Sequence, residues 1–157
     1  MREYQLIRSQ RLPLPLARVF SFFAEPRNLA RITPPGLGFR IVTTGELIMT
    51  PGLTIEYRIS PLLVPQRWVS EITVYEPPHR FVDEQRVGPY RKWHHLHEFE
   101  AVAGGTEIRD VVTYALPFGP LGSLAHALLV RRQLEGIFAC RSRVVEGMIE
   151  REGRGAP

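Results

Sequence analysis

The chain has 157 residues, of which 44% are hydrophobic and 23% charged, with a net charge of +4. A single domain of this size buries a core without disulfides or metals, and the one cysteine, Cys140, excludes an internal disulfide and favours a reducing, cytoplasmic setting. The apolar runs are too short for a membrane span. Nucleic-acid binding needs clustered basic residues, and only Arg131, Arg132, Arg141 and Arg143 gather, on what the pattern indicates is a solvated helix face. We therefore expect no nucleic-acid partner.

The first part of the chain predicts a strand and two short helices. The string YQLIRSQRLPLP alternates between apolar and polar residues, which indicates a strand over residues 4–13. Apolar residues then recur at helical spacing between Leu16 and Phe23. Pro26 ends this helix and can begin a second one over residues 27–32.

The middle of the chain alternates like a series of strands separated by turns rich in glycine and proline. Strands that follow one another through short turns pair antiparallel, because parallel neighbours need long crossovers. The strands expected here cover residues 39–43, 53–60, 66–76, 81–87, 90–102 and 105–116.

Beyond the string LPFGPLG, the apolar residues return to helical spacing and predict a long helix to about residue 150, with a break near Leu129. Residues 1–151 are expected to form one α+β domain, and residues 152–157 a frayed tail. A curved sheet of seven strands packed against one helix leaves space that side chains fill incompletely. The expected arrangement therefore contains a ligand cavity.

Four strings in this order of elements resemble the SRPBCC superfamily. The superfamily includes START lipid-transfer domains, birch-pollen-allergen-like proteins and polyketide cyclases, and the chain is similar to its bacterial ligand-binding members. The resemblance spans about residues 3–148 and implies the helix-grip fold, in which a curved sheet wraps around the C-terminal helix, but it implies no single reaction. The strings are VFSFFAEPRNLARITPP, FVDEQRVGPYRKWHHLHEFE, GGTEIRDVVTYALPFGPLG and VRRQLEGIF.

Three histidines stand within four residues of the predicted strand 90–102. Because successive side chains of a strand point to opposite faces, His95 and His97 share one face with Trp93 and Phe99. His94 shares the other face with charged residues. We therefore expect His95 and His97 to point into the cavity and His94 to point to solvent.

The following strand adds a carboxylate to the inward face. The pair Gly104-Gly105 predicts a two-residue hairpin turn. In that register, Tyr114 lies opposite His95, and Asp110 lies diagonal to His97, within reach of a hydrogen bond. Because buried ionisable groups cost several kcal/mol unless they are paired, we expect a His97–Asp110 pair.

The strand before the histidines adds Asp83 and Gln85 to the same face. The length of the connecting loop is not evident from the sequence, so Asp83 opposes either Trp93 or His95. We expect His95 to pair with Asp83 or with Tyr114. The full predicted cavity wall is Tyr57, Trp68, Asp83, Gln85, Trp93, His95, His97, Phe99, Asp110 and Tyr114.

This cluster allows a satisfied polar network, a ligand-recognition or acid–base site, or a metal site. Two histidines and a carboxylate are a legitimate metal-ligand set. The sequence has no supporting His-x-Glu or Cys-x-x-Cys motif, so we expect no metal and no cofactor.

Three functions follow from this reading. The favoured one is binding of an amphipathic or hydrophobic small molecule. The second is a cyclase, dehydratase or isomerase that uses His95 or His97 as general base, oriented by Asp110. The third is a regulatory module whose ligand controls a protein partner. The sequence leaves a homodimer open.

Overall fold

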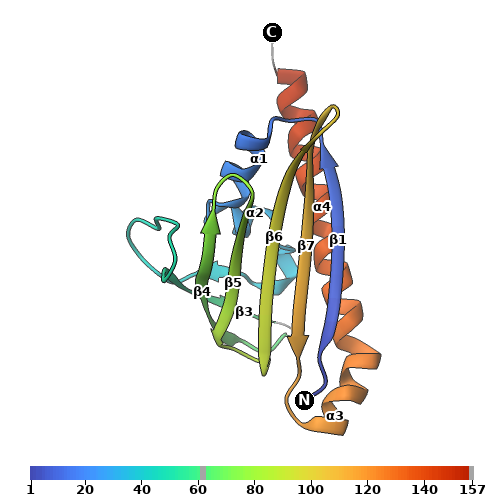
Figure 1. Cartoon of the computed structure of the whole chain (residues 1–157). Helices are drawn as coiled ribbons and strands as arrows, with labels where there is room; N and C mark the ends of the chain where they lie inside the picture. Colours follow the sequence, from blue (N-terminus) through green and yellow to red (C-terminus); the bar gives the residue numbers. More distant parts are fainter. Residues whose placement is uncertain (61–62, 156–157) are drawn as a thin grey trace.

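A computed structural model describes residues 1–60 and 63–155. Its strands form one antiparallel sheet in the order β1-β7-β6-β5-β4-β3-β2, which curves around the C-terminal helix (Figure 1). This arrangement confirms the predicted seven-stranded α+β helix-grip fold. The strands are β1 (Tyr4–Leu12), β2 (Arg40–Ile41), β3 (Thr54–Ile59), β4 (Gln66–Glu76), β5 (Arg80–Val87), β6 (Lys92–Val102) and β7 (Gly105–Ala115).

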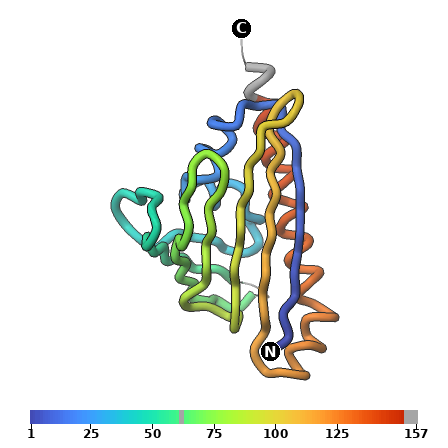
Figure 2. The backbone as a smooth tube through the Cα atoms, viewed as in Figure 1, coloured from blue at the N-terminus to red at the C-terminus, as the bar shows by residue number. Residues whose placement is uncertain are grey.

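Helices occupy two parts of the chain, and Figure 2 traces the path between them. The first group lies between β1 and β2 and comprises α1 (Leu16–Phe23), α2 (Asn28–Ile32) and the 3-10 turn η1 (Pro35–Leu37). The second group follows β7 after residues 116–118 and comprises three consecutive segments: α3 (Gly119–Ala125), the π-helical segment η3 (His126–Val130) and α4 (Arg131–Gly155). Among the described helices, none has the length and hydropathy needed to cross a membrane.

Several boundaries differ by one or two residues from the sequence-based expectation, and the largest changes are in β2 and at the end of α4. The expected strand 39–43 shrinks to two residues, because the N–H groups of Val42 and Thr43 both donate to the carbonyl oxygen of Glu56 and regular pairing ends there. The expected frayed tail begins as helix, since α4 continues to Gly155. Residues 156–157 of that tail lie outside the described part of the chain. The helix break expected near Leu129 coincides with η3.

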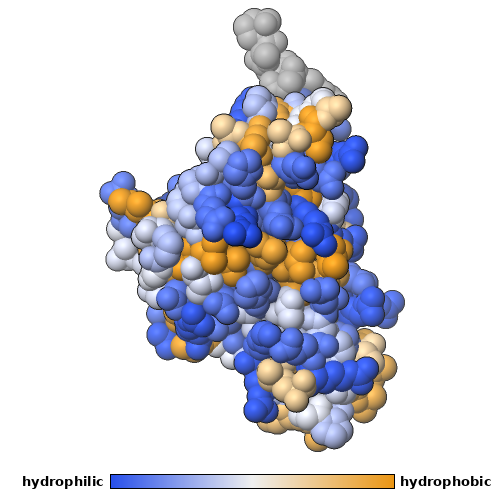
Figure 3. All heavy atoms as spheres, viewed as in Figure 1, coloured by the Kyte–Doolittle hydropathy of each residue, from blue (hydrophilic) through white to orange (hydrophobic). Residues whose placement is uncertain are grey.

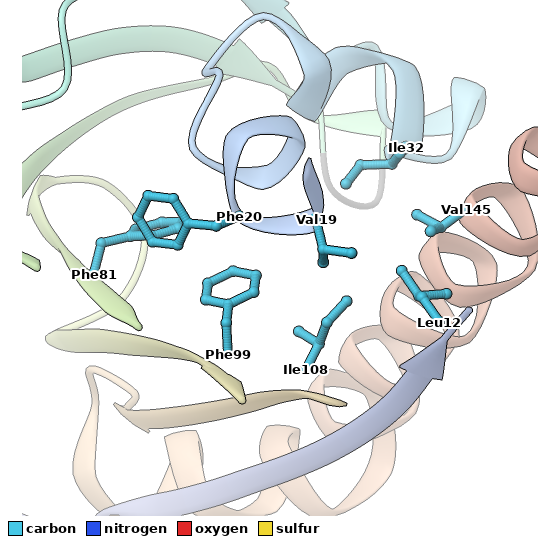
Figure 4. Packing of buried hydrophobic residues seen from close by; sticks show 8 residues of the cluster. All are labelled: Leu12, Val19, Phe20, Ile32, Phe81, Phe99, Ile108 and Val145. Carbon is cyan, nitrogen blue, oxygen red and sulfur yellow. The ribbon is translucent and has the colours of Figure 1, made fainter. Parts of the chain in front are cut away.

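One apolar cluster closes the space between the sheet and α4 at one end. In Figure 4, Val19 and Phe20 of α1 point toward Phe99 and Ile108 of the sheet, and Val145 extends from α4 on the far side. Residues spaced by three or four in α1 supply the buried face of that helix. The buried members of this cluster are Leu12, Val19, Phe20, Ile32, Phe81, Phe99, Ile108 and Val145.

A second cluster packs α4 against the other end of the sheet. Its buried members are Val112, Tyr114, Leu134 and Phe138. The polar side chains of β6 lie between the two clusters along the strand, because the inward positions of β6 run Trp93, His95, His97, Phe99.

The outer face of the sheet follows the opposite alternation. Cross-strand pairing aligns Val82, Leu96, Val111 and Ile7 in one row, and Figure 3 shows an orange band crossing this face between blue ones. Charged residues flank the row and pair across strands, as Arg109 does with Glu98 at 3.2 Å. His94, paired with Thr113, belongs to this outer face.

Candidate functional site

A cavity of about 460 Å³ lies between the inner face of the sheet, α2 and α4. Aliphatic and aromatic side chains make up most of its wall, among them Leu29 of α2, Ile55 of β3 and Ile137 of α4. Of the ten residues that the sequence assigns to the cavity, six line it: Tyr57, Trp68, Asp83, Trp93, His95 and His97.

The other four lie near the cavity but are not among the described residues of its wall. Gln85 binds the main chain of Tyr90, donating to its carbonyl oxygen at 2.6 Å and accepting from its N–H at 3.2 Å. Phe99 belongs to the cluster around α1. Tyr114 and Asp110 are covered by neighbouring side chains, Tyr114 by the second apolar cluster and Asp110 by the histidines.

The register between β6 and β7 differs by two residues from the predicted one. Val102 pairs with Gly105, so Ala103 and Gly104 form the turn. Gly104 has the positive φ of +83° that such a turn needs, whereas Gly105 is required for close packing: a Cβ there would lie 1.9 Å from the carbonyl oxygen of Leu12. The two glycines thus serve different purposes, which the dipeptide alone does not reveal.

A shift of two residues leaves every side chain on its predicted face but changes its neighbours. His97 lies directly opposite Asp110 rather than diagonal to it, and His95 lies opposite Val112 rather than Tyr114. On the other side of β6, Asp83 pairs with His95, which settles the alternative that loop length left open.

The shortest histidine–aspartate hydrogen bonds are exchanged relative to the prediction, while the predicted His97–Asp110 pair is also present at 3.2 Å. His95 Nε2 lies 2.8 Å from Asp110 Oδ1, and His97 Nε2 lies 2.7 Å from Asp83 Oδ2. The predicted partners are at longer range: His97 Nδ1 is 3.2 Å from Asp110 Oδ1, and His95 Nδ1 is 3.6 Å from Asp83 Oδ2. Each short bond runs diagonally across the sheet, so the two carboxylates bracket both imidazoles. We call these four residues the His–Asp network.

Aromatic rings hold the two imidazoles in place. The ring centroids of His95 and His97 are 3.6 Å apart, and Phe81 stacks on the other face of His97 at 4.1 Å. Phe138 of α4 contacts His95 edge-on at 5.6 Å. Both imidazoles are buried, with exposures of 5% for His95 and 8% for His97. The network therefore has little freedom to rearrange without moving its neighbours.

Burial and pairing act in opposite directions on the acid–base properties of this network. Burial alone would raise the pKa of Asp83 and Asp110, but hydrogen bonds and positive charge from the histidines outweigh it and lower both pKa values. Burial lowers the pKa of His95, reinforced by the charge of His97. At His97, hydrogen bonds to Asp110 and Asp83 outweigh burial and raise the pKa. The pair therefore favours one shared proton, held by His97.

A second polar group in the wall centres on Ser70, which the sequence does not single out. The indole N–H of Trp68 donates to the Ser70 hydroxyl at 3.0 Å, and the Tyr57 hydroxyl lies 2.9 Å from the same oxygen. Burial, with the charge of Asp83, raises the pKa of the Tyr57 phenol and keeps it neutral. Alternation along β4 places Ser70 on the same face as Trp68, so the signal was present but ambiguous.

Arg141 is the main residue that sequence reasoning misplaces. Its side chain lines the cavity, with the guanidinium carbon 4.8 Å from the centre of the Phe138 ring. The pattern of basic residues suggested a solvated helix face instead. The spacing of Leu134, Phe138, Arg141 and Val145 does, however, put Arg141 in phase with the buried stripe of α4.

His126 is a further buried residue, on η3, to which the sequence assigns no site role. Its Nε2 lies 2.6 Å from the Tyr114 hydroxyl, and its ring stacks on Tyr4 at 3.5 Å. These contacts tie the π-helical segment to β1 and β7.

The His–Asp network also brings potential metal ligands together, since ligand atoms of Asp83, His95 and His97 lie within 4.8 Å of one another. The 2.7 Å separation of His97 Nε2 and Asp83 Oδ2 is a hydrogen-bond length, with a proton between the two atoms. The geometry therefore fits a proton-linked network, and the absence of a metal stays a prediction.

The fold and cavity define a helix-grip protein, and the sequence comparison gives the family. The chain matches the family of polyketide cyclases/dehydrases and lipid transport proteins over residues 12–137, so it belongs to that family, within the SRPBCC superfamily. No curated protein matches it at the sequence level.

Solved structures agree on the fold. Protein Ms6760 from Mycobacterium smegmatis is 17% identical with a TM-score of 0.65, covering 94% of this chain and 92% of its own. Protein NE0264 from Nitrosomonas europaea is 12% identical with a TM-score of 0.69, covering 96% of each chain. The protein Ara h 8.0201 is 17% identical with a TM-score of 0.61, covering 92% of this chain and 99% of its own. At these identities the likeness concerns the fold alone.

Proposed function

We propose that the protein binds an amphipathic small molecule in the cavity between the sheet and α4. The observation that carries this proposal is the cavity itself, about 460 Å³ in volume, with a largely aromatic and aliphatic wall and fewer polar groups, most of them on the sheet. Cavities that bind organic ligands are typically about 300–1,000 Å³ and combine these two features. Membership of a family whose description includes lipid transport supports the same reading.

The wall suggests how such a ligand would lie. Trp68 and Trp93 meet edge to face at 5.2 Å and present flat apolar surfaces suited to a ring or a chain. Tyr57, Asp83 and His95 supply polar atoms on the sheet side. The apolar body of the ligand would contact the aromatic wall, while its polar group would be oriented by these side chains.

A second candidate is catalysis of the cyclase, dehydratase or isomerase type, favoured by the presence of two imidazoles in the cavity wall. A general base needs a nitrogen that is free to accept the substrate's proton. Each of the four imidazole nitrogens here faces a carboxylate, at distances from 2.7 to 3.6 Å. The geometry therefore supports binding better than proton transfer.

Native mass spectrometry of freshly purified protein tests the proposal directly. We expect a bound species, lost on denaturation, whose mass and fragmentation identify it as an amphipathic molecule. The variant Ile41→Trp enlarges a partly buried side chain of the wall and should reduce occupancy. Its matched control is Ile7→Trp, the same change on the outer face of the sheet, which should not.

Fluorescence provides a test that does not depend on a co-purified ligand. Both tryptophans of the chain, Trp68 and Trp93, line the cavity. The neutral apolar dye N-phenyl-1-naphthylamine should therefore quench their emission as it binds to wild type. In the two variants, which each add a tryptophan, the dye's own emission is the measure: it should rise with Ile7→Trp as with wild type, but much less with Ile41→Trp. Failure of the wild-type protein both to retain a ligand and to bind this dye would contradict the proposed function.

A further inference from the structure

The strongest unassigned feature of the cavity is the guanidinium of Arg141. It enters from α4, on the side opposite the sheet, where the other lining residues of the helix are Gln133, Leu134, Ile137 and Phe138. Arg141 is half-buried, and its Nε is shielded from solvent, so this part of the charged guanidinium has lost water as a hydrogen-bond partner. Its presence there calls for a partner inside the cavity.

Within the described part of the chain, that partner is missing. The Nε–H of Arg141 is shielded from solvent and has no hydrogen-bond acceptor. The carboxylate of Asp83, which lies within electrostatic range of Arg141, is hydrogen-bonded to His97 instead. The ring of Phe138 offers Arg141 a cation–π contact at 4.8 Å, which does not supply an acceptor for the Nε–H.

Arg141 also faces the polar side of the wall. Its charge lowers the pKa of Asp83 and acts in the same direction on Tyr57, so the guanidinium lies within electrostatic range of both groups. The cavity thus has a cationic donor on the α4 side and a phenol and the His–Asp network on the sheet side.

We propose that Arg141 binds an anionic oxygen group, a carboxylate or its equivalent, carried by the cavity's ligand. The inference rests on the proposed binding function and narrows its ligand to an organic acid with an apolar body. The planar guanidinium matches a carboxylate through two parallel N–H···O bonds, which would satisfy the buried Nε–H.

Two dyes of nearly the same shape test this assignment. The first, 8-anilino-1-naphthalenesulfonate, carries an anionic oxygen group, and the second, N-phenyl-1-naphthylamine, lacks it. We expect Arg141→Gln to weaken binding of the anionic dye by roughly 10–100-fold, the range for loss of hydrogen bonds to a charged group. Binding of the neutral dye should be unchanged. Arg141→Lys should retain part of the preference, because it keeps the charge but loses the planar fork.

Two controls isolate the cavity. Arg143→Gln removes the same charge from an exposed position of α4 and should affect neither dye. The double variant Leu121→Ser, Leu124→Ser removes exposed apolar side chains of α3, so unchanged affinities would show that the dyes do not bind there. Circular dichroism checks that each variant is folded.

The outcomes separate the two proposals. If wild type binds the neutral dye but Arg141→Gln weakens both dyes equally, or neither, the anion subsite is wrong and the apolar binding function stands. If wild type binds neither dye, the proposed function fails and the subsite fails with it.

Discussion

The imidazoles of His95 and His97 stack with their centroids 3.6 Å apart, and their shortest hydrogen bonds run in opposite directions across the sheet. His95 binds Asp110 of β7, whereas His97 binds Asp83 of β5. Two like rings at this distance cannot both hold a positive charge at little cost. Their environments therefore separate them into a protonated and a neutral partner, and this relationship leads to the first prediction.

We expect His97 to remain protonated above pH 6.5 while His95 is neutral. Burial opposes the charge on both rings, but hydrogen bonds to Asp110 and Asp83 prevail at His97 and raise its pKa, whereas burial and the charge of His97 lower the pKa of His95. Long-range ¹H–¹⁵N spectra recorded across a pH titration distinguish the two states. Two imidazoles that both deprotonate below pH 6.5 would contradict this assignment.

The raised pKa of His97 has a consequence for stability. A group whose pKa rises on folding stabilises the fold fully below its unfolded value, here 6.5, and this stabilisation is lost as the pH rises through the folded pKa. The free energy of unfolding of wild type should therefore fall above pH 6.5 relative to that of His97→Gln. Urea denaturation at several pH values measures the difference.

Removing one carboxylate from the network should be strongly destabilising. Asp110→Asn keeps a carbonyl oxygen beside the imidazoles but removes the negative charge that both histidines face, at a cost of about 3 kcal/mol in the free energy of unfolding. The matched control is Glu98→Gln, which neutralises a half-exposed carboxylate on the outer face, paired with Arg109, and should cost less than about 1 kcal/mol. If urea denaturation shows equal losses of unfolding free energy for the two variants, the His–Asp network contributes no more to stability than an exposed ion pair.

The contact between Tyr114 and His126 should stabilise the π-helical segment. Tyr114→Phe leaves the buried imidazole without its hydrogen bond, at a cost of about 1–3 kcal/mol. A double variant, Tyr114→Phe with His126→Phe, removes both polar groups and keeps the stacking on Tyr4, so it should be more stable than the single variant. Thermal unfolding compares the three proteins. A double variant less stable than the single one would disprove this account.

We expect no stoichiometric metal at Asp83, His95 and His97, because protons already join these side chains. Elemental analysis of protein purified without chelators should find zinc, iron and manganese well below one ion per chain. One equivalent of metal that disappears in His97→Ala, while the protein stays folded, would overturn this expectation.

The features that the sequence predicts correctly depend mainly on the local spacing of apolar and polar residues. Alternation along residues 92–102 assigns each histidine to a face, because the period of a strand is two and does not depend on its neighbours. Helical spacing locates α4 and the position of the break at η3. The motifs shared with the superfamily predict the order of elements and the curved sheet around the terminal helix.

Only the tertiary structure decided which side chains of neighbouring elements contact one another. The register of β6 against β7 depends on Gly105, which must pass close to Leu12, a residue more than ninety positions away in the sequence. That register, together with the direction in which the imidazole rings lean along the strand, makes Asp110 the closest hydrogen-bond partner of His95 and Asp83 the closest partner of His97. From its residue type alone, Arg141 is expected on the protein surface. Only the packing of α4 on the sheet places its guanidinium inside the cavity, because the direction of the side chain depends on how the whole helix is rotated against its neighbours.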